Sequence, residues 1–363
     1  MNVAAMQSTM PTLYSNLKFL RFPEHLQALR EQRTVAPVHI RIKPINRCNH
    51  DCWYCAYRVS NLHLGEDIDY DDSIPEAKMY EIVDDVIAMG VKAVTFTGGG
   101  EPLLYKPLPG VVRRLAQGGV RVATLTNGSN LKGRVADAFA EYATWVRVST
   151  DAWDDRSFSR SRGVRDGAFA DLLKNIRGFA ARNSRCVLGV SFIVDENNCG
   201  HLYDACALLK DAGVNHVKIS GVVVSNSGTE NNAYHARIRD TVTAQIARAT
   251  TLADDRFAVI NHYHDLDERF DKHYTLCPYL MFLTVIGADC TVYTCQDKAF
   301  TKSGTLGSIQ DRRFRDFWFS GENHRRLFAL NPATDCTHHC VSHAKNLAIL
   351  NLLSVDPDHG MFV

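Results

Sequence analysis

Six short apolar segments alternate along the chain with longer segments whose apolar residues recur every three or four positions. The short segments have the length and residue types of β-strands. They are His39–Ile45, Ala93–Thr97, Arg121–Thr126, Trp145–Ser149, Val187–Val194 and Val217–Val223. Most are apolar throughout rather than strictly alternating, which is typical of strands covered on both faces. The pattern therefore predicts a sheet that is buried between other elements.

The longer segments predict helices. In Ile74–Met89 one helical face carries the apolar residues Met79, Ile82, Val83, Val86 and Ile87. Ser73 and Glu76 have the spacing of a capping box, and Gly90 is expected to end this helix. Further helices are predicted at Lys106–Gln117, Leu131–Glu141, Gly200–Ala212 and Ala233–Ala253, and along the apolar stripe of Phe169, Leu172, Leu173, Ile176 and Phe179.

Strands that alternate with helices predict right-handed βαβ units and a parallel sheet, which is an α/β fold. Periodicity alone leaves open a doubly wound sheet or a partial barrel, and either one places its chemistry at the carboxyl ends of the strands. The alternation stops near Phe257, so we expect a domain boundary between residues 255 and 265. The predicted organisation is a lead-in over 1–36, an α/β domain over 37–255 and a smaller domain over 256–363.

Composition narrows the class of protein. The 363 residues are 45% hydrophobic and 22% charged, which is the balance of an ordinary globular chain. Lys and Arg number 41 against 40 Asp and Glu, so charge gives no argument for a nucleic-acid or membrane-surface partner. No apolar run reaches transmembrane length, and the N-terminus lacks the pattern of a signal peptide. We expect a cytoplasmic protein.

The 11 cysteines are an odd number in a chain expected to stay in a reducing compartment, which favours metal binding over disulfides. Three lie within eight residues at positions 48, 52 and 55, and five lie in the last quarter, at positions 277, 290, 295, 336 and 340. Cys186, Cys199 and Cys206 stand apart, and we expect them to be small buried hydrophobic residues.

The first group, Cys48, Cys52 and Cys55, follows directly on the first predicted strand. Thiolates suit iron–sulfur clusters and zinc. A closed zinc site would need a fourth ligand, which His50 could supply. Three cysteines alone would instead leave one iron of a 4Fe–4S cubane open to bind and activate a small molecule.

This spacing on a loop after the first strand resembles that of the radical S-adenosylmethionine (SAM) enzymes. The resemblance implies that Cys48, Cys52 and Cys55 hold a 4Fe–4S cluster whose fourth iron is chelated by SAM. In that family an electron from the cluster cleaves SAM to methionine and a 5′-deoxyadenosyl radical, which abstracts a hydrogen atom from a C–H bond. The resemblance covers about residues 37–225 and favours a partial (β/α)6 TIM-like barrel over a doubly wound sheet.

The resemblance extends to residues expected to bind SAM. The run Gly98-Gly99-Gly100-Glu101 ends the second strand and resembles the family's GGE motif, in which the carboxylate binds the SAM amine. The extra glycine leaves open which two glycines make the contact, and we take Gly99 and Gly100. The remaining SAM contacts implied by the resemblance are Tyr54 near the adenine, Asn127 after the third strand, Ser149 and Asp151 near the ribose, and Arg162, or alternatively Arg160, near the SAM carboxylate.

The C-terminal cysteines form a second pattern. Cys277 precedes a predicted hairpin at Leu283–Cys295, and an aromatic helix separates the hairpin from Cys336 and Cys340. This order resembles the "twitch" extension, a relative of the SPASM domain, and implies an auxiliary 4Fe–4S cluster on Cys277, Cys295, Cys336 and Cys340. Two alternatives stay open: Cys290 could replace Cys295, and His338 and His339 could complete a Cys/His zinc site.

Two clusters would imply a two-electron oxidation, such as alcohol to ketone, in which the auxiliary cluster accepts the second electron. Epimerisation would need a hydrogen donor, for which Cys290, Cys186 and Cys199 are candidates, and peptide cross-linking is a third outcome. The favoured base is Asp297. The stretch His262–Asp265 is the alternative, although an ordinary surface loop is the better interpretation of it.

No peptide-recognition domain is evident before residue 37, so we expect a small polar substrate such as an amino sugar or aminoglycoside, with flavodoxin or ferredoxin as electron donor. The rival hypothesis of another class is a non-catalytic iron–sulfur or zinc protein. Such a protein would have no need of Glu101 or Ser149.

Overall fold

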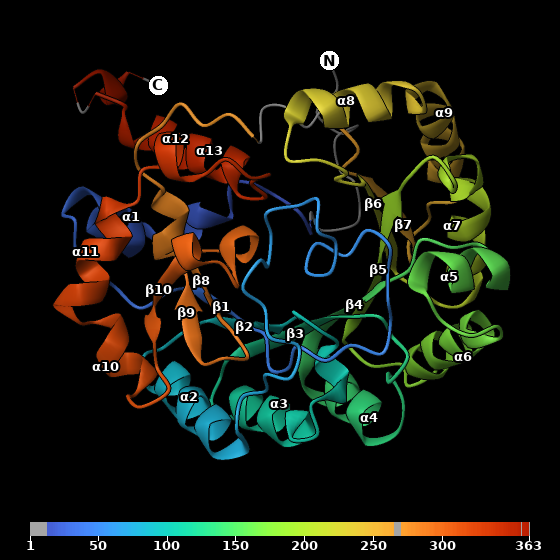
Figure 1. Ribbon diagram of the computed structural model, residues 1–363, viewed down its shortest axis with the longest axis horizontal. Coiled ribbons are helices and arrows are strands. Elements are labelled where there is room, and N and C mark those ends of the chain that lie inside the picture. The colour runs from blue at the N-terminus through green and yellow to red at the C-terminus, as the bar shows by residue number, and fades with distance from the viewer. Residues whose placement is uncertain (1–12, 265–269, 357, 363) are drawn as a thin grey trace.

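The computed structural model describes residues 13–264, 270–356 and 358–362 and contains one curved ten-stranded sheet (Figure 1). The strand order is β10-β9-β8-β1-β2-β3-β4-β5-β6-β7. The seven strands of the barrel are β1 His39–Ile42, β2 Ala93–Phe96, β3 Arg121–Thr126, β4 Ala143–Ser149, β5 Val187–Val194, β6 His216–Gly221 and β7 Ala258–Asn261. Neighbours in this set pair in parallel, as predicted.

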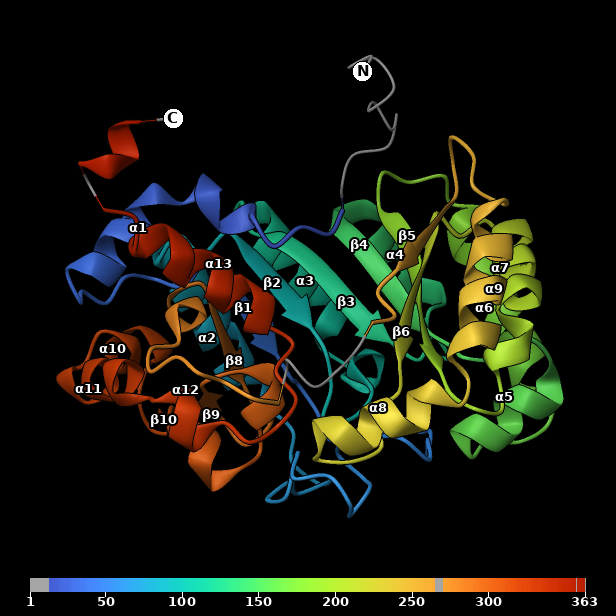
Figure 2. The same ribbon diagram turned by 90° about the horizontal axis from the view of Figure 1, so that it is seen from above.

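Helices cover the outer face of the curved sheet, and the C-terminal helices lie beside its other end (Figures 1 and 2). The helices are α1 Pro23–Arg30, α2 Glu76–Ala88, α3 Leu108–Gln117, α4 Gly133–Tyr142, α5 Asp155–Arg162, α6 Ala168–Ala180, α7 Leu202–Asp211, α8 Gly228–Ala236, α9 Arg239–Thr250, α10 Phe314–Trp318, α11 Gly321–Ala329, α12 Pro332–Asp335 and α13 His343–Leu353. Strands inside and helices outside make an open barrel, so the predicted partial TIM-like barrel is confirmed.

Alternate side chains of each strand point to opposite faces of the sheet. On β1 the outward residues Ile40 and Ile42 are fully buried under the helices. On β4 the outward residues Val146 and Val148 are likewise fully buried. The residues between them, such as Arg41, face the inside of the barrel.

Two helix predictions need correction. The capping box at Ser73 is wrong: α2 begins after Pro75, which has no side-chain cap, and the Ser73 hydroxyl instead donates to Pro44 O at 3.4 Å. Gly90 ends the helix as predicted, with a φ of +72°. The helix predicted over 233–253 is two helices, α8 and α9, and α8 begins earlier because the Ser227 hydroxyl caps it by accepting from Glu230 N.

The alternation does not stop at Phe257, because a seventh parallel strand, β7, pairs with β6. The predicted hairpin is confirmed as β8 Leu283–Ile286 and β9 Thr291–Tyr293, followed by β10 Thr305–Ser308. β8 pairs in parallel with β1, so the C-terminal segment extends the barrel sheet itself. The domain boundary between residues 255 and 265 stays a prediction. The ten-stranded sheet contains strands from both sides of it.

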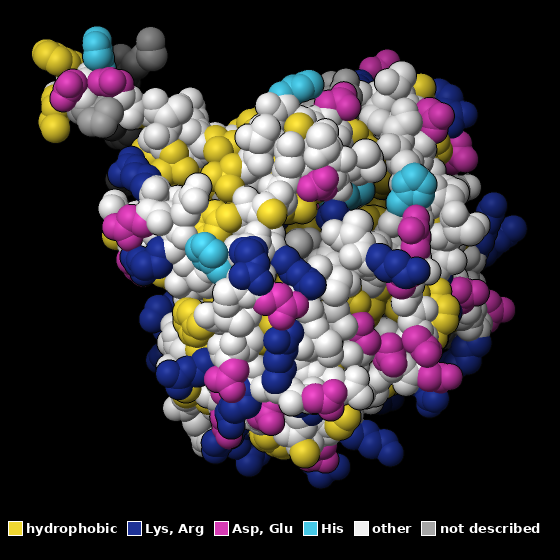
Figure 3. Space-filling model, turned by 60° about the vertical axis from the view of Figure 1, so that its left-hand side comes forward, with side chains coloured by type: hydrophobic (Ala, Val, Ile, Leu, Met, Phe, Trp, Pro, Cys, Tyr) yellow, Lys and Arg dark blue, Asp and Glu magenta, His cyan; other side chains and the backbone are white. Residues whose placement is uncertain are grey.

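Cys186 and Cys206 are buried as predicted. Cys199 is only half-buried, so that prediction is wrong: it lies in a short turn before α7, where its thiol faces Glu196 O at 3.6 Å. Within the described ranges, no helix combines the length and apolar character needed to cross a bilayer. On the face shown in Figure 3, acidic and basic side chains are interspersed.

Candidate active site

The loop after β1 carries Cys48, Cys52 and Cys55, and all three thiols are partly exposed. Asn127 Nδ2 lies 4.0 Å from Cys48 Sγ, and Arg162 Nη1 lies 3.5 Å from Cys52 Sγ. Burial raises the pKa of Cys48 to about 11, so this thiol would lose its proton at neutral pH only on binding a metal.

Among the residues that the structure describes, the three sulfurs do not form a group in which all ligand atoms lie within 4.8 Å of one another. A single zinc ion would need such a group, whereas in a cubane each cysteine binds its own iron. The geometry therefore favours the iron–sulfur alternative at this loop.

The glycine turn after β2 packs directly on this cysteine loop. A Cβ at Gly100 would lie 2.0 Å from Arg47 O, and one at Gly99 would lie 2.2 Å from Asn46 Oδ1. Two backbone bonds join the segments, from Gly100 N to Ile45 O at 3.2 Å and from Glu101 N to Arg47 O at 2.9 Å. Side chains larger than hydrogen would push the two segments apart.

Glu101 is held between the ends of β2 and β3 with only 2% of its surface exposed. Its Oε1 accepts from Thr126 Oγ1 at 2.6 Å and from Leu103 N at 3.0 Å, and its Oε2 accepts from Asn127 N at 2.7 Å. Burial raises the pKa of Glu101 to about 7, and these three hydrogen bonds oppose the rise. The result is a positioned carboxylate that an ammonium group would stabilise.

Asp151 and Arg162 form a buried ion pair, with Asp151 Oδ2 2.6 Å from Arg162 Nη2. Tyr54 OH also donates to Asp151 Oδ2, and Arg162 Nη2 donates to Ser149 Oγ at 3.2 Å. The backbone of the same helix end holds the cysteine loop, because Asp51 N donates to Arg162 O at 2.8 Å. Four of the predicted SAM-binding residues are thus brought together beside the loop.

The two candidate arginines differ in position. Arg160 is exposed and lines an open groove, together with Trp53 and Trp153. Arg162 is buried and contacts Cys52 Sγ. The structure therefore places Arg162, rather than Arg160, at the cysteine loop.

The four C-terminal cysteines predicted to act together line one pocket. They are Cys277, Cys295, Cys336 and Cys340. Burial raises the pKa of Cys295 well above its ordinary value, and Asp297 and the other three thiols add to the rise. Cys290 lies elsewhere: it occupies the hairpin turn with a φ of +58° and packs in the hydrophobic core.

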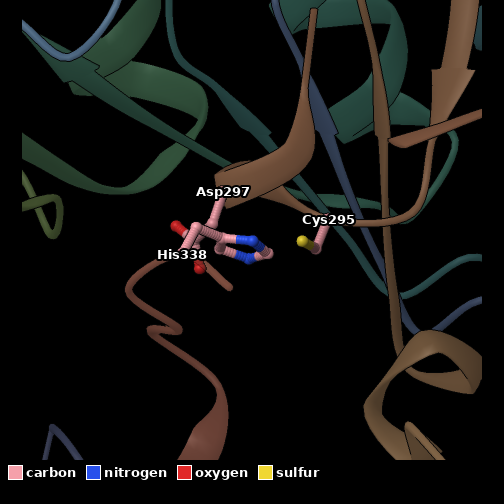
Figure 4. A group of neighbouring side chains, drawn as sticks. All are labelled: Cys295, Asp297 and His338. Atoms are coloured by element: carbon pink, nitrogen blue, oxygen red, sulfur yellow. The ribbon is translucent and has the colours of Figure 1, made fainter. Parts of the chain in front are cut away.

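Asp297 lies in the wall of this pocket with 7% of its surface exposed, and its Oδ2 accepts from Val341 N at 2.9 Å. Figure 4 shows it beside Cys295 and His338, whose ligand atoms and those of Asp297 all lie within 4.8 Å of one another. The three ligand atoms are close enough together to bind one metal ion. In the Cys/His zinc alternative, the carboxylate of Asp297 would therefore be a further ligand.

Two residues between the cysteine groups, Lys43 and Tyr57, were missed from the sequence. Lys43, fully buried, donates from Nζ to Tyr57 OH at 2.7 Å and to Gly98 O at 2.8 Å. The pKa of Lys43 is lowered well below its ordinary value, chiefly by burial and also by Arg41, and Asp297, Cys55 and Cys295 only oppose this shift. In the sequence, His39, Arg41 and Lys43 alternate with two isoleucines. This alternation could have predicted that the three basic residues lie on one face of the first strand and its extension.

The alternative base stretch, His262–Asp265, follows β7 along the chain. The ring centroid of His262 lies 5.3 Å from that of Tyr14, and Tyr263 OH lies 3.1 Å from His235 Nδ1 on α8. Neither His262 nor Tyr263 lines the pocket that contains Asp297. Asp265 lies outside the described residues. Asp297 therefore stays the favoured base.

Residues 42–199 match the sequence model of the Radical SAM superfamily. Over these residues the chain is therefore similar to radical SAM proteins, a class that uses a 4Fe–4S cluster and SAM. The match spans the cysteine loop, the glycine turn and the Asp151–Arg162 pair.

Two curated relatives show where the likeness lies. Pre-heme d1 synthase of Dinoroseobacter shibae is 33% identical over 215 residues, which are 58% of this chain and 50% of the relative. The S-adenosylmethionine-dependent nucleotide dehydratase of Lacinutrix mariniflava is 32% identical over 139 residues, 36% of this chain and 29% of the relative. The chain thus spans half or less of the length of these relatives.

Solved structures share the fold at low identity. Streptococcus suis SuiB bound to S-adenosylmethionine superposes with a TM-score of 0.60 at 14% identity, covering 87% of this chain and 74% of SuiB. Native anSMEcpe with bound AdoMet gives a TM-score of 0.57 at 14% identity, covering 88% of this chain and 97% of that chain. Both likenesses extend well beyond residue 199, so the fold is shared over most of the chain.

Proposed function

We propose that this chain cleaves SAM reductively and oxidises a small polar substrate by two electrons. The observation that carries the proposal is the position of Lys43 and Tyr57. Lys43 Nζ donates at 2.7 Å to the OH of Tyr57, two residues after Cys55, and Tyr57 OH donates at 3.3 Å to the backbone oxygen of Gln296, the residue after Cys295. This chain of hydrogen bonds supports a substrate site in the barrel interior between the two groups.

The residues at the first group fit a cluster and SAM. Cys48, Cys52 and Cys55 would hold three irons, and Glu101 would bind the SAM ammonium. When bound, the cluster and SAM supply a 5′-deoxyadenosyl radical that removes a hydrogen atom from the substrate. Ser149, Asp151 and Tyr54 would orient the nucleoside, and Asn127 would hold the loop through Cys48.

The second group fits an electron acceptor. Cys277, Cys295, Cys336 and Cys340 share one pocket and would hold a second 4Fe–4S cluster that takes the second electron. Asp297 lies in the same pocket and would accept the substrate proton on its carboxylate. A flavodoxin or ferredoxin would supply the first electron.

Dehydrogenation fits the described residues better than epimerisation by a cysteine. Cys290 and Cys186 are buried in the core, at 4% and 7% exposure, and Cys199 lies in the short turn before α7 with its thiol facing Glu196 O at 3.6 Å. None of the three lines the pocket of the second group. A thiol hydrogen donor would have to come from that pocket or from the first loop, where cysteines are needed as ligands.

Anaerobic reconstitution tests the proposal. We expect about eight iron and eight sulfide per chain, with 5′-deoxyadenosine formed on reduction. Cys52→Ala should abolish 5′-deoxyadenosine formation, whereas Cys336→Ala should spare it, leave about four iron and stop substrate oxidation. Stoichiometric zinc without SAM cleavage would refute the proposal. Equal loss of cleavage in both variants would refute the separate roles.

A further inference from the structure

We propose that the substrate carries phosphate or carboxylate groups, which bind Arg41 and Arg147 on the inner face of the barrel. The inference rests on the proposed function and names the substrate class of that same interior.

Strand register places both arginines inside the barrel. Arg41 pairs with Thr95, and Arg147 pairs with Leu125 and Gly189, so each shares a sheet face with its partners. The flanking residues on β1 and β4 point outward and are fully buried under helices. Both arginines are nevertheless partly exposed.

Neither guanidinium is fully satisfied. Within the described part of the chain, Nε of Arg41 and Nε of Arg147 are buried and have no hydrogen-bond partner. Arg147 Nη1 donates to Tyr14 OH at 3.0 Å, a neutral group. Arginine stays charged at any physiological pH, and an oxyanion would supply the missing acceptors in bidentate geometry.

The surrounding charge is unbalanced. Arg147 acts on Arg41 as a like charge, and Asp297 is the carboxylate that opposes it. Lys218 faces the same side of β6, because it pairs with Ser191. A purely cationic substrate, such as an unmodified aminoglycoside, would be repelled here, whereas a sugar bearing phosphate or carboxylate would be attracted.

The placement also suits the reaction. Ser149 lies two residues beyond Arg147 on the same face of β4, which corresponds to a rise of about 6–7 Å. If Arg147 binds an anionic group of the substrate, a carbon about one sugar ring from that group would lie near Ser149, at the SAM-binding end of the strand. The arginines would anchor the substrate, and the reacting carbon would lie at the barrel mouth.

Calorimetric titration of the anaerobic holoenzyme tests this inference, with inorganic pyrophosphate and citrate as separate probes and spermidine as the cationic control. We expect the native protein to bind at least one anion and not spermidine. Which anion binds more tightly distinguishes a phosphate from a carboxylate site. Arg147→Gln and Arg41→Gln should each weaken that binding at least tenfold, whereas Arg134→Gln, an exposed residue on α4, should not change it.

Arg147→Lys keeps the charge and should retain binding within about tenfold, which guards against a folding defect in Arg147→Gln. Iron content, measured on every variant, should be unchanged. Binding of neither anion, or equal binding in Arg147→Gln and Arg134→Gln, would overturn the inference. Loss of iron in both Arg147→Gln and Arg147→Lys would also overturn the inference, because Arg147 would then be needed to stabilise a cluster and not to bind the substrate. SAM cleavage is assayed separately, so its absence would refute the proposed function and leave the anion site standing.

Discussion

Replacing Arg162 by Gln tests whether the buried ion pair holds the cysteine loop in place. The substitution leaves Asp151 buried without its cation and removes the contact of Arg162 with Cys52 Sγ. We expect the variant to lose both thermal stability and iron.

The magnitude follows from burial. The side chains of Arg162 and Asp151 are 3% and 1% exposed, and removing one partner of such a pair costs roughly 3–5 kcal/mol. One kcal/mol lowers the melting temperature by roughly 2–4 °C in domains of 150–250 residues, so we expect a loss of at least about 6 °C. The matched control is Arg165→Gln, because Arg165 and Asp171 form a pair that is 71% and 60% exposed. Such a pair is worth about 0–1 kcal/mol.

Anaerobic thermal melts and iron assays measure the effect. The double variant Asp151→Asn/Arg162→Gln should regain part of the stability that Arg162→Gln loses, because two amides leave no buried charge. If Arg162→Gln melts within about 2 °C of Arg165→Gln, the buried pair does not hold the loop, and the reasoning fails.

Three further outcomes follow from other parts of the molecule. Gly100→Ala should lose iron because its Cβ would lie 2.0 Å from Arg47 O, whereas Gly178→Ala, which meets nothing within 4 Å, should not. Burial raises the pKa of Glu101 to about 7, and only the ionised carboxylate attracts the SAM ammonium. The affinity for SAM should therefore fall about tenfold from pH 8 to pH 6. In the variant Glu101→Gln the affinity should no longer depend on pH in this range. Burial lowers the pKa of His216 from 6.5 to about 4, so on acidification the unfolded chain takes up this proton before the folded protein does. Between pH 7 and pH 5 the free energy of unfolding should therefore fall by about 2 kcal/mol, as measured by urea unfolding. The variant His216→Gln should not show this loss.

The barrel was largely predictable because its strands are apolar and separated by helical periodicity. The strand that escaped, β7, is four residues long, and three of them are only half-buried. Such a segment carries little of the apolar signal on which strand prediction depends. Its pairing with β6 is a tertiary property of the sheet.

The cysteine groups were predictable for a different reason. Thiol spacing is fixed by chain geometry, so Cys48, Cys52 and Cys55 could be grouped from the sequence alone. The choice between Cys290 and Cys295 could not be made, because it depends on which way the hairpin turns. The turn gives Cys290 a positive φ and points it into the core, away from the pocket that Cys295 lines.

The position of the second group relative to the first depends on β1. The first cysteine loop follows β1, and β8, whose hairpin leads to Cys295, pairs with β1 in parallel. His39 lies opposite Leu283 and Ile42 opposite Ile286, so a hydrogen-bonded register connects the two groups. A flexible linker between domains would let their separation vary. Because the register fixes it, the barrel interior between them, with Arg41 and Lys43, has a defined width into which a substrate must fit.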